Sequence, residues 1–138
     1  MEKALLFSVL LFGPTWAFFR QFVGIRGQLS CGKVPLQTAT VTLWNKKLIG
    51  SDSEMARTVT DRNGAFEIQG NDTSLLSLNV LLRVSHHCKE KQPCRTVVDL
   101  PVPSEFITRS DDVTKWFPAG HLNMAYRFPD ETRACDKF

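Results

Sequence analysis

The sequence predicts an all-β protein, a two-sheet β-sandwich of seven to eight short strands with one short helical turn. Apolar and polar residues alternate in many short runs, which is typical of half-buried strands. Turn signals rich in Gly, Pro, Asn and Asp separate these runs at close intervals. No long segment has the period of an amphipathic helix. At 138 residues, the chain is long enough to bury the core of one such domain.

The clearest turn signal is the dipeptide Asn63-Gly64. Both central residues of a two-residue type I′ turn need positive φ, which Gly adopts freely and Asn tolerates. The dipeptide therefore predicts a β-hairpin. Val59 before the turn and Phe66 and Ile68 after it are predicted to share the buried face, with Thr60 near water.

The same alternation predicts the other strands. It is most regular over residues 76–84, where the even-numbered positions are all apolar and several odd-numbered ones are polar. Ser104 is predicted to cap one helical turn, 104–107, and residues 70–74 are predicted to be a loop. The predicted strands are 22–31, 38–44, the two arms of the hairpin, 78–87, 94–100, 113–117 and 121–128.

Residues 1–17 are predicted to be a signal peptide, and residues 18–138 the mature sandwich domain. Residues 4–12 form an apolar run too short to span a bilayer, and Gly13-Pro14 ends it. Small residues at the positions read by signal peptidase place the cleavage after Ala17. No later segment is apolar enough for a transmembrane helix, and the C-terminus lacks a lipid-anchor signal. The sequence therefore predicts a secreted, soluble, extracellular protein.

Four cysteines, all in the predicted mature chain, agree with a secretory route. Four cysteines allow three pairings. Residue parity places Cys88 and Cys94 on the same side of two neighbouring strands, which favours a bond between them. That assignment leaves Cys31 bonded to Cys135, so that the first strand is tied to the end of the chain.

Charge and one sequon mark candidate sites. The net charge is +3, with neither a basic run nor interleaved aromatics, so the sequence does not indicate nucleic-acid binding. Four lysines at predicted strand ends are candidates to contact a receptor or an anionic lipid surface: Lys46, Lys47, Lys89 and Lys91. Asn71 opens the triplet Asn-Asp-Thr and is the predicted glycosylation site.

Signals for metal binding and catalysis are weak. His86, His87, Cys88 and Cys94 are zinc-type ligands, but adjacent histidines on a strand point to opposite faces, and cysteines of secreted proteins are oxidised. The sequence has no Gly-x-Ser-x-Gly elbow, phosphate-binding loop or paired-carboxylate signature. We therefore expect no metal, no cofactor and no enzymatic activity.

Several short motifs follow one another in a characteristic order. They are 27–35 (Gly-Gln-Leu-Ser-Cys-Gly-Lys-Val-Pro), 60–66 (Thr-Asp-Arg-Asn-Gly-Ala-Phe), 86–88 (His-His-Cys), 93–94 (Pro-Cys), 120–124 (Gly-His-Leu-Asn-Met) and the final Cys135. This set resembles the nematode transthyretin-like family of small secreted proteins. The resemblance implies a prealbumin-like, Ig-like sandwich with an extracellular role. A related branch hydrolyses hydroxyisourate and ends in Tyr-Arg-Gly-Ser, whereas this chain ends differently.

These observations favour a secreted, non-enzymatic binding or adaptor module. Its loops would contact a cell-surface receptor protein or an anionic, phosphatidylserine-like head group. Its edge strands would also allow pairing with a second copy. One alternative is a carrier of a small apolar ligand, and a less favoured one is a hydroxyisourate-hydrolase-like enzyme.

Overall fold

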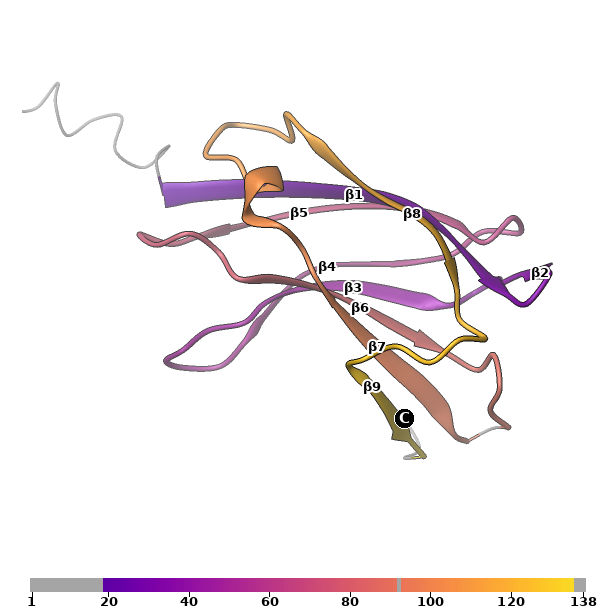
Figure 1. Ribbon diagram of the computed structural model, residues 1–138. Coiled ribbons are helices and arrows are strands. Elements are labelled where there is room, and N and C mark those ends of the chain that lie inside the picture. Colours follow the sequence, from indigo (N-terminus) through magenta and orange to yellow (C-terminus); the bar gives the residue numbers. More distant parts are fainter. Residues whose placement is uncertain (1–18, 92, 136–138) are drawn as a thin grey trace, which may run out of the picture.

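The computed structural model describes residues 19–91 and 93–135, so the predicted signal peptide lies outside the described residues. Within this part of the chain, nine strands form two facing sheets, which confirms the predicted all-β sandwich (Figure 1). The described residues contain no helix long and apolar enough to cross a membrane. The elements are β1 (Arg20–Cys31), β2 (Val34–Pro35), β3 (Thr40–Asn45), β4 (Ser53–Val59), β5 (Ala65–Thr73), β6 (Val80–His86), β7 (Arg95–Pro101), the 3-10 turn η1 (Ser104–Phe106), β8 (Trp116–Asn123) and β9 (Glu131–Ala134).

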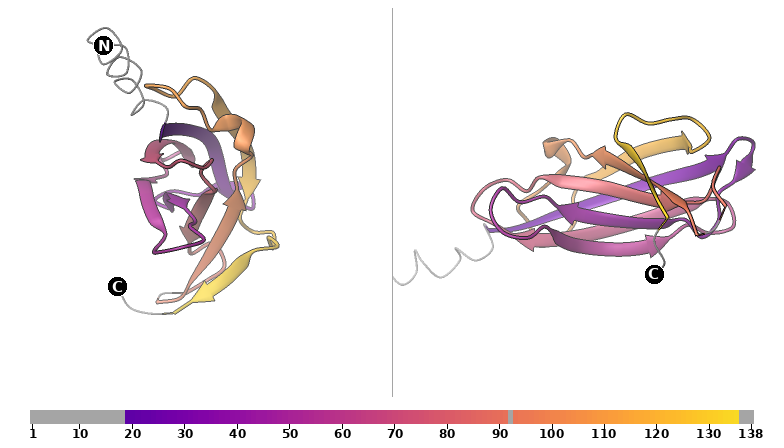
Figure 2. Two further views of the ribbon diagram at one scale, coloured as in Figure 1. Left: turned by 90° about the vertical axis from the view of Figure 1, so that its left-hand side faces the viewer. Right: turned by 90° about the horizontal axis from the view of Figure 1, so that it is seen from below.

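One sheet is built around β1 and the other around β6. In the four-stranded sheet, β1 pairs with β2 and β5 in antiparallel fashion and with β8 in parallel. The five-stranded sheet has the order β4-β3-β6-β7-β9 and is antiparallel throughout. Figure 2 shows the two layers packed face to face. Chain neighbours such as β4 and β5 thus belong to different sheets.

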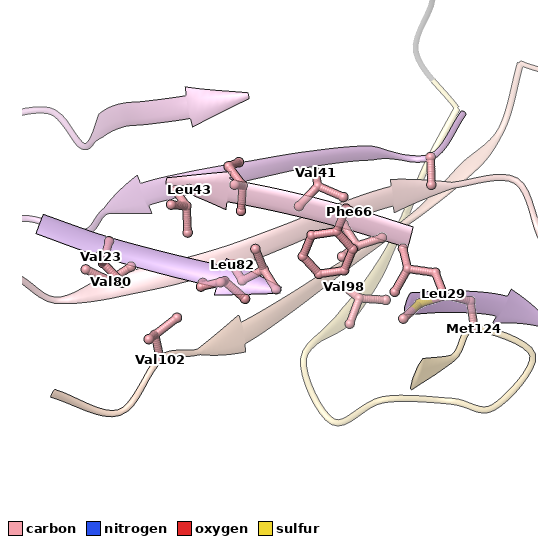
Figure 3. Packing of buried hydrophobic residues seen from close by; sticks show 14 of the residues in the cluster. Val23, Leu29, Val41, Leu43, Phe66, Val80, Leu82, Val98, Val102 and Met124 are labelled. Carbon is pink, nitrogen blue, oxygen red and sulfur yellow. The ribbon is translucent and has the colours of Figure 1, made fainter. Parts of the chain in front are cut away.

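The core lies between the sheets, on the inward side of each strand. Val23, Ile25 and Leu29 of β1 are fully buried, as their alternation predicts, and they belong to one cluster with Val41 and Leu43 of β3. Figure 3 shows the side chains of Val23, Leu29, Val41 and Leu43 between the translucent strands. Full burial of one such aliphatic side chain contributes about 1.5 to 3 kcal/mol. The contact between the sheets is therefore the main source of stability.

The Asn63-Gly64 turn joins the two sheets and does not form the predicted hairpin. β4, before the turn, pairs with β3, and β5, after it, pairs with β1. Of the two turn residues only Gly64 has positive φ, so the type I′ prediction is also wrong. The Asp61 carboxylate accepts hydrogen bonds from the N–H groups of Asn63 and Ala65, both at 2.9 Å, which stabilise this crossover. A Cβ at position 64 would collide with the carbonyl oxygen of Leu29.

Burial before this turn is reversed relative to the prediction. Phe66 and Ile68 are buried as expected, but Val59 is 56% exposed and Thr60 only 3%. The Thr60 hydroxyl donates to the Leu36 carbonyl oxygen at 2.6 Å and accepts from the Ala39 N–H at 2.9 Å. Two hydrogen bonds to the segment between β2 and β3 thus offset the cost of burying this hydroxyl. The crossover, rather than a hairpin register, determines which side chain turns inward.

The C-terminal part differs from the prediction in three details. Residues 116–123 form one strand, β8, instead of two strands broken at Pro118. Among the described strands, β8 pairs with β1 alone, and proline is tolerated in an edge strand of this kind. β9 is an additional strand with a largely polar sequence. The predicted helical turn is present as η1, but Pro103 occupies the N-cap position and Ser104 does not cap it.

The predicted disulfide pairing is wrong. Cys31 is bonded to Cys88 and Cys94 to Cys135, in place of the predicted Cys88–Cys94 and Cys31–Cys135. Continuing the inward side of β6 does lead to Cys88, but this side faces the other sheet, where Cys31 ends β1. Cys94 meets Cys135 because the unpredicted β9 pairs with the first residues of β7. One bond therefore joins the two sheets, and the other fastens an edge strand.

Peptide mapping of the unreduced protein should recover Cys31 linked to Cys88 and Cys94 linked to Cys135. The double change Cys31→Ser/Cys88→Ser should lower the free energy of unfolding by about 4 kcal/mol, because it releases a long covalent loop. The matched change Cys94→Ser/Cys135→Ser should cost a similar amount but expose mainly β9 to amide hydrogen exchange. Recovery of a Cys88–Cys94 peptide would contradict the structure.

His86 is a titratable side chain in the core, where it is 2% exposed. Its Nδ1 accepts a hydrogen bond from the backbone N–H of Cys88 at 3.1 Å, so the ring is neutral with its proton on Nε2. Burial lowers the pKa of His86 from its ordinary value near 6.5, and the carboxylates of Glu131 and Glu90 oppose this shift only in part. Protonation of Nδ1 would place a positive charge in the core and would break the hydrogen bond that Nδ1 accepts from the N–H of Cys88.

The free energy of unfolding should therefore fall in mild acid. A lowered pKa in the folded state means that the unfolded chain binds the proton more readily. Stability from neutral His86 should be complete above about pH 6.5 and decrease as the pH falls towards the folded-state pKa. Urea unfolding at about pH 7.5 and about pH 5 would measure this loss. His86→Asn retains an acceptor but does not titrate, so it should reduce the pH dependence of the free energy of unfolding. The exposed control His121→Asn should leave this pH dependence unchanged.

Candidate functional site

The four candidate lysines lie at two opposite ends of the sandwich. Lys46 and Lys47 follow β3, whose last residue is opposite the first residue of β6. Lys89 and Lys91 follow the other end of β6, a strand of seven residues that spans about 20 Å. Figure 1 shows the β3–β4 and β6–β7 connections at opposite ends. The two pairs therefore do not form one surface.

Two loops meet at the end that carries Lys46 and Lys47. We call residues 46–52 and 74–79 together the loop end. The N–H of Lys46 donates to the carbonyl oxygen of Asn79 at 2.9 Å, and the N–H of Asn79 donates to Oδ1 of Asn45 at 3.2 Å. These bonds hold the two loops side by side.

Four large aliphatic side chains are exposed on the loop end. Leu48 is 100% exposed, Ile49 92%, Leu75 73% and Leu76 74%. The two loops enclose a groove of about 520 Å³, which Leu48, Ile49 and Leu76 help to line. The alternation of even-numbered positions predicts that Leu76 is buried. Leu76 is exposed instead, because it lies before β6 begins. An apolar group of this size on a protein surface commonly marks a contact site.

Positive charge borders the aliphatic side chains. The carboxylate of Asp52 accepts from the N–H of Lys47 at 2.9 Å and forms an ion pair with Nζ of Lys46 at 3.0 Å. The bond from Lys47 and the neighbouring Lys46 together lower the pKa of Asp52. On the second loop, Nη2 of Arg109 donates to the carbonyl oxygen of Leu75 at 3.0 Å. A cation thus lies beside each exposed loop.

Asn71, the predicted glycosylation site, lies on β5 rather than in a loop. It is exposed and opposite Phe22 of β1. β5 is an edge strand of the four-stranded sheet, and Asn71 lies near the strand end that leads into the loop end. Its side chain is accessible, and its glycosylation stays a prediction.

The histidines and cysteines do not gather at one point. His86 faces the core, whereas His87 is exposed with Nδ1 2.8 Å from the carbonyl oxygen of Cys94, and His121 is exposed on β8. All four cysteines are in disulfides. Among residues 19–91 and 93–135, no group of three or more His, Cys, Asp or Glu side chains is arranged to hold a metal ion.

The exposed aliphatic residues are the part of the loop end that the sequence prediction does not include. Leu48-Ile49 lies inside an otherwise polar segment, between Lys47 and Gly50, where no strand or contact site is predicted. Two apolar residues together in a polar loop have no core to enter. That pattern could have identified the loop end.

Comparison with known proteins agrees with the fold. A family model described as the transthyretin-like family matches residues 26–103. Transthyretin-like protein 46 of Caenorhabditis elegans is 31% identical over 96% of this chain and 76% of its own length. Transthyretin-like proteins 33 and 5 of the same organism are 30% and 31% identical, over 86% and 83% of this chain and 85% and 84% of theirs. The chain therefore belongs to the transthyretin-like family.

Proposed function

We propose that the protein is a secreted, non-enzymatic binding module that recognises anionic phospholipid head groups on a cell surface through the loop end. The observation that carries the proposal is the joint exposure of Leu48, Ile49, Leu75 and Leu76 beside Lys46 and Lys47. Aliphatic side chains can enter the boundary between head groups and acyl chains, and nearby cations attract anionic lipids. The loop end combines both properties at one tip of an elongated domain.

The position of the loop end supports contact with the membrane surface and does not require the sheets to enter the bilayer. The loop end lies beyond the strands, so it can meet a surface without opening either sheet. Each lysine near an anionic surface contributes about 1 kcal/mol, and each buried methylene about 0.8 kcal/mol. Binding should therefore depend on both charge and apolar contact.

The core argues against the carrier alternative. Val23, Leu43 and Leu82 are at most 1% exposed, and their side chains fill the space between the sheets where a small apolar ligand would lie (Figure 3). The enzyme alternative lacks support as well, since the two exposed histidines belong to different sheets: His87 follows β6, and His121 lies on β8. A binding module is the function that best fits both observations.

The secreted protein should begin at Phe18 and consist of 121 residues, because 17 of the 138 residues belong to the predicted signal peptide. Expression in a eukaryotic secretory host and intact-mass measurement would test this. The mass should also include an N-linked glycan that Asn71→Gln removes. Retention of residues 1–17 in the exported protein would contradict the predicted cleavage.

The secreted protein should float with vesicles of phosphatidylcholine and phosphatidylserine, but not with phosphatidylcholine alone. Binding should weaken between low and physiological salt, because the ionic part is screened. Leu48→Ser/Ile49→Ser should reduce the bound fraction by about tenfold, since it removes apolar contact. Lys46→Gln/Lys47→Gln should reduce the preference for phosphatidylserine.

Two matched variants provide the controls. Val34→Ser removes an aliphatic side chain that is 64% exposed at the opposite end of the domain. Lys89→Gln/Lys91→Gln removes the same charge as the Lys46/Lys47 variant at that opposite end. Both should bind vesicles as the unchanged protein does. If Lys89→Gln/Lys91→Gln abolishes binding while Leu48→Ser/Ile49→Ser does not, the loop end is not the contact. Absence of binding at either salt would favour a cell-surface receptor protein instead.

A further inference from the structure

The outer face of the five-stranded sheet holds a groove that is separate from the loop end. Its volume is about 390 Å³, within the usual range of ligand sites. Strands β4, β3, β6 and β7 all contribute to its lining. The lining residues on which its chemistry depends include Arg57, Arg83, Arg95, Trp44, Thr42 and Ser85.

Arg83 on β6 is held in a fixed orientation at the centre of this face. Its Nε and Nη2 donate to Oδ1 and Oδ2 of Asp99 at 2.8 and 3.1 Å. Its guanidinium also lies 5.3 Å from the centroid of the Trp44 ring. Arginine has five N–H donors, so the Nη1 hydrogens remain for a ligand oxygen. The side chain is therefore preorganised and need not lose much rotamer entropy on binding.

A second guanidinium lies in the same row of the sheet. Thr42 is opposite Arg57 on one side and opposite Arg83 on the other. Neighbouring strands are about 4.8 Å apart, so the two arginine backbones are about 10 Å apart. Nη2 of Arg57 is held by Oε1 of Glu54 at 2.6 Å. The row thus presents two oriented guanidinium groups on either side of Thr42, whose hydroxyl already accepts from Nε1 of Trp44 at 3.0 Å and donates to the carbonyl oxygen of Arg83 at 3.4 Å.

The floor of the groove offers side chains alone as polar partners. The backbones of β3 and β6 are paired on both sides, so their N–H and C=O groups are used within the sheet. The side chains of Thr40 and Ser85 lie in the next row. His87 has Nδ1 2.8 Å from the carbonyl oxygen of Cys94, and because a carbonyl only accepts, Nδ1 carries a proton. The face therefore offers hydroxyls and one imidazole nitrogen, Nε2 of His87, beside the guanidinium groups.

Positive charge continues beyond one end of the groove. His87 lies next to the β6–β7 connection, which carries the exposed Lys89 and Lys91. The carboxylate of Glu90 between them is bound by Nε of Arg133 at 2.9 Å, so it offsets little of their charge. This arrangement favours an anionic ligand longer than the groove itself.

We propose that this groove binds a saccharide that carries sulfate or carboxylate groups. Such oxyanions suit oriented guanidinium groups, and sugar hydroxyls suit Thr40, Ser85 and His87. A peptide would instead seek main-chain partners, which sheet edges provide and this face does not. The inference goes beyond the proposed lipid contact and does not depend on it.

Calorimetric titration of the full secreted protein at physiological salt would test this site. The probes are a heparin-derived oligosaccharide, a hyaluronan-derived oligosaccharide that has carboxylates only, and inorganic sulfate. Saturable binding of either saccharide, with inorganic sulfate much weaker, would support the proposal, and the tighter saccharide would identify the preferred oxyanion. Sulfate binding as tightly as the saccharides would indicate an adventitious ion only, and no saccharide binding would overturn the proposal.

The chain offers a matched pair of arginine variants. Arg57→Gln should weaken saccharide binding by about tenfold, because it removes one charge-assisted contact. Arg26 is also exposed, pairs with Glu67 at 2.9 Å and lies over Trp116 at 4.2 Å, but on the other sheet. Arg26→Gln removes the same charge and should change binding less than about twofold. Equal weakening by both variants would mean attraction to net charge and would overturn the assignment to the groove.

Discussion

The structure depends on the burial of alternate side chains between two sheets. β1 contributes Val23, Ile25 and Leu29 from one sheet, and β6 contributes Val80 and Leu82 from the other; all five are at most 2% exposed. Neither sheet could keep these residues from water alone. The outward residues of β6, such as Arg83 and Ser85, line the proposed groove on the outer face. The loop end lies beyond the strands and uses residues that neither sheet buries.

The two outer faces differ because one of them is already covered. On the four-stranded sheet, Trp116 lies over Gly24, where a Cβ would approach its ring carbons to 2.7 Å. Arg26 stacks on that ring and pairs with Glu67. On the five-stranded sheet, Trp44 lies beside its arginine at the margin of an open groove. Similar residue types thus close one face and leave the other accessible.

The sequence predicted fold class and inward faces well, because alternation directly reports which side of a strand is buried. Val41, Leu43, Val84 and Val98 all lie in the core as this period requires. Alternation does not say which strand pairs with which. The Asn63-Gly64 sequence therefore predicts a hairpin, although this turn connects strands of different sheets.

The same limit explains the errors in the disulfides and the site. Alternation correctly places Cys88 on the inward side of its strand. Its partner, Cys31, lies at the end of β1 in the facing sheet, which alternation does not reveal. β9, with the sequence Glu-Thr-Arg-Ala, has no apolar alternation and so gave no signal for Cys135. The lysines were grouped by their position at strand ends, and only the register of β3 with β6 shows that they are at opposite ends.

Both disulfides lie at the end opposite the loop end, where β1, β6 and β9 finish and β7 begins. A tensile load between the two ends would run parallel to the strands. The hydrogen bonds of each ladder would then be sheared together instead of opening one after another. The direction of the strands therefore makes the domain resistant to mechanical extension along its length.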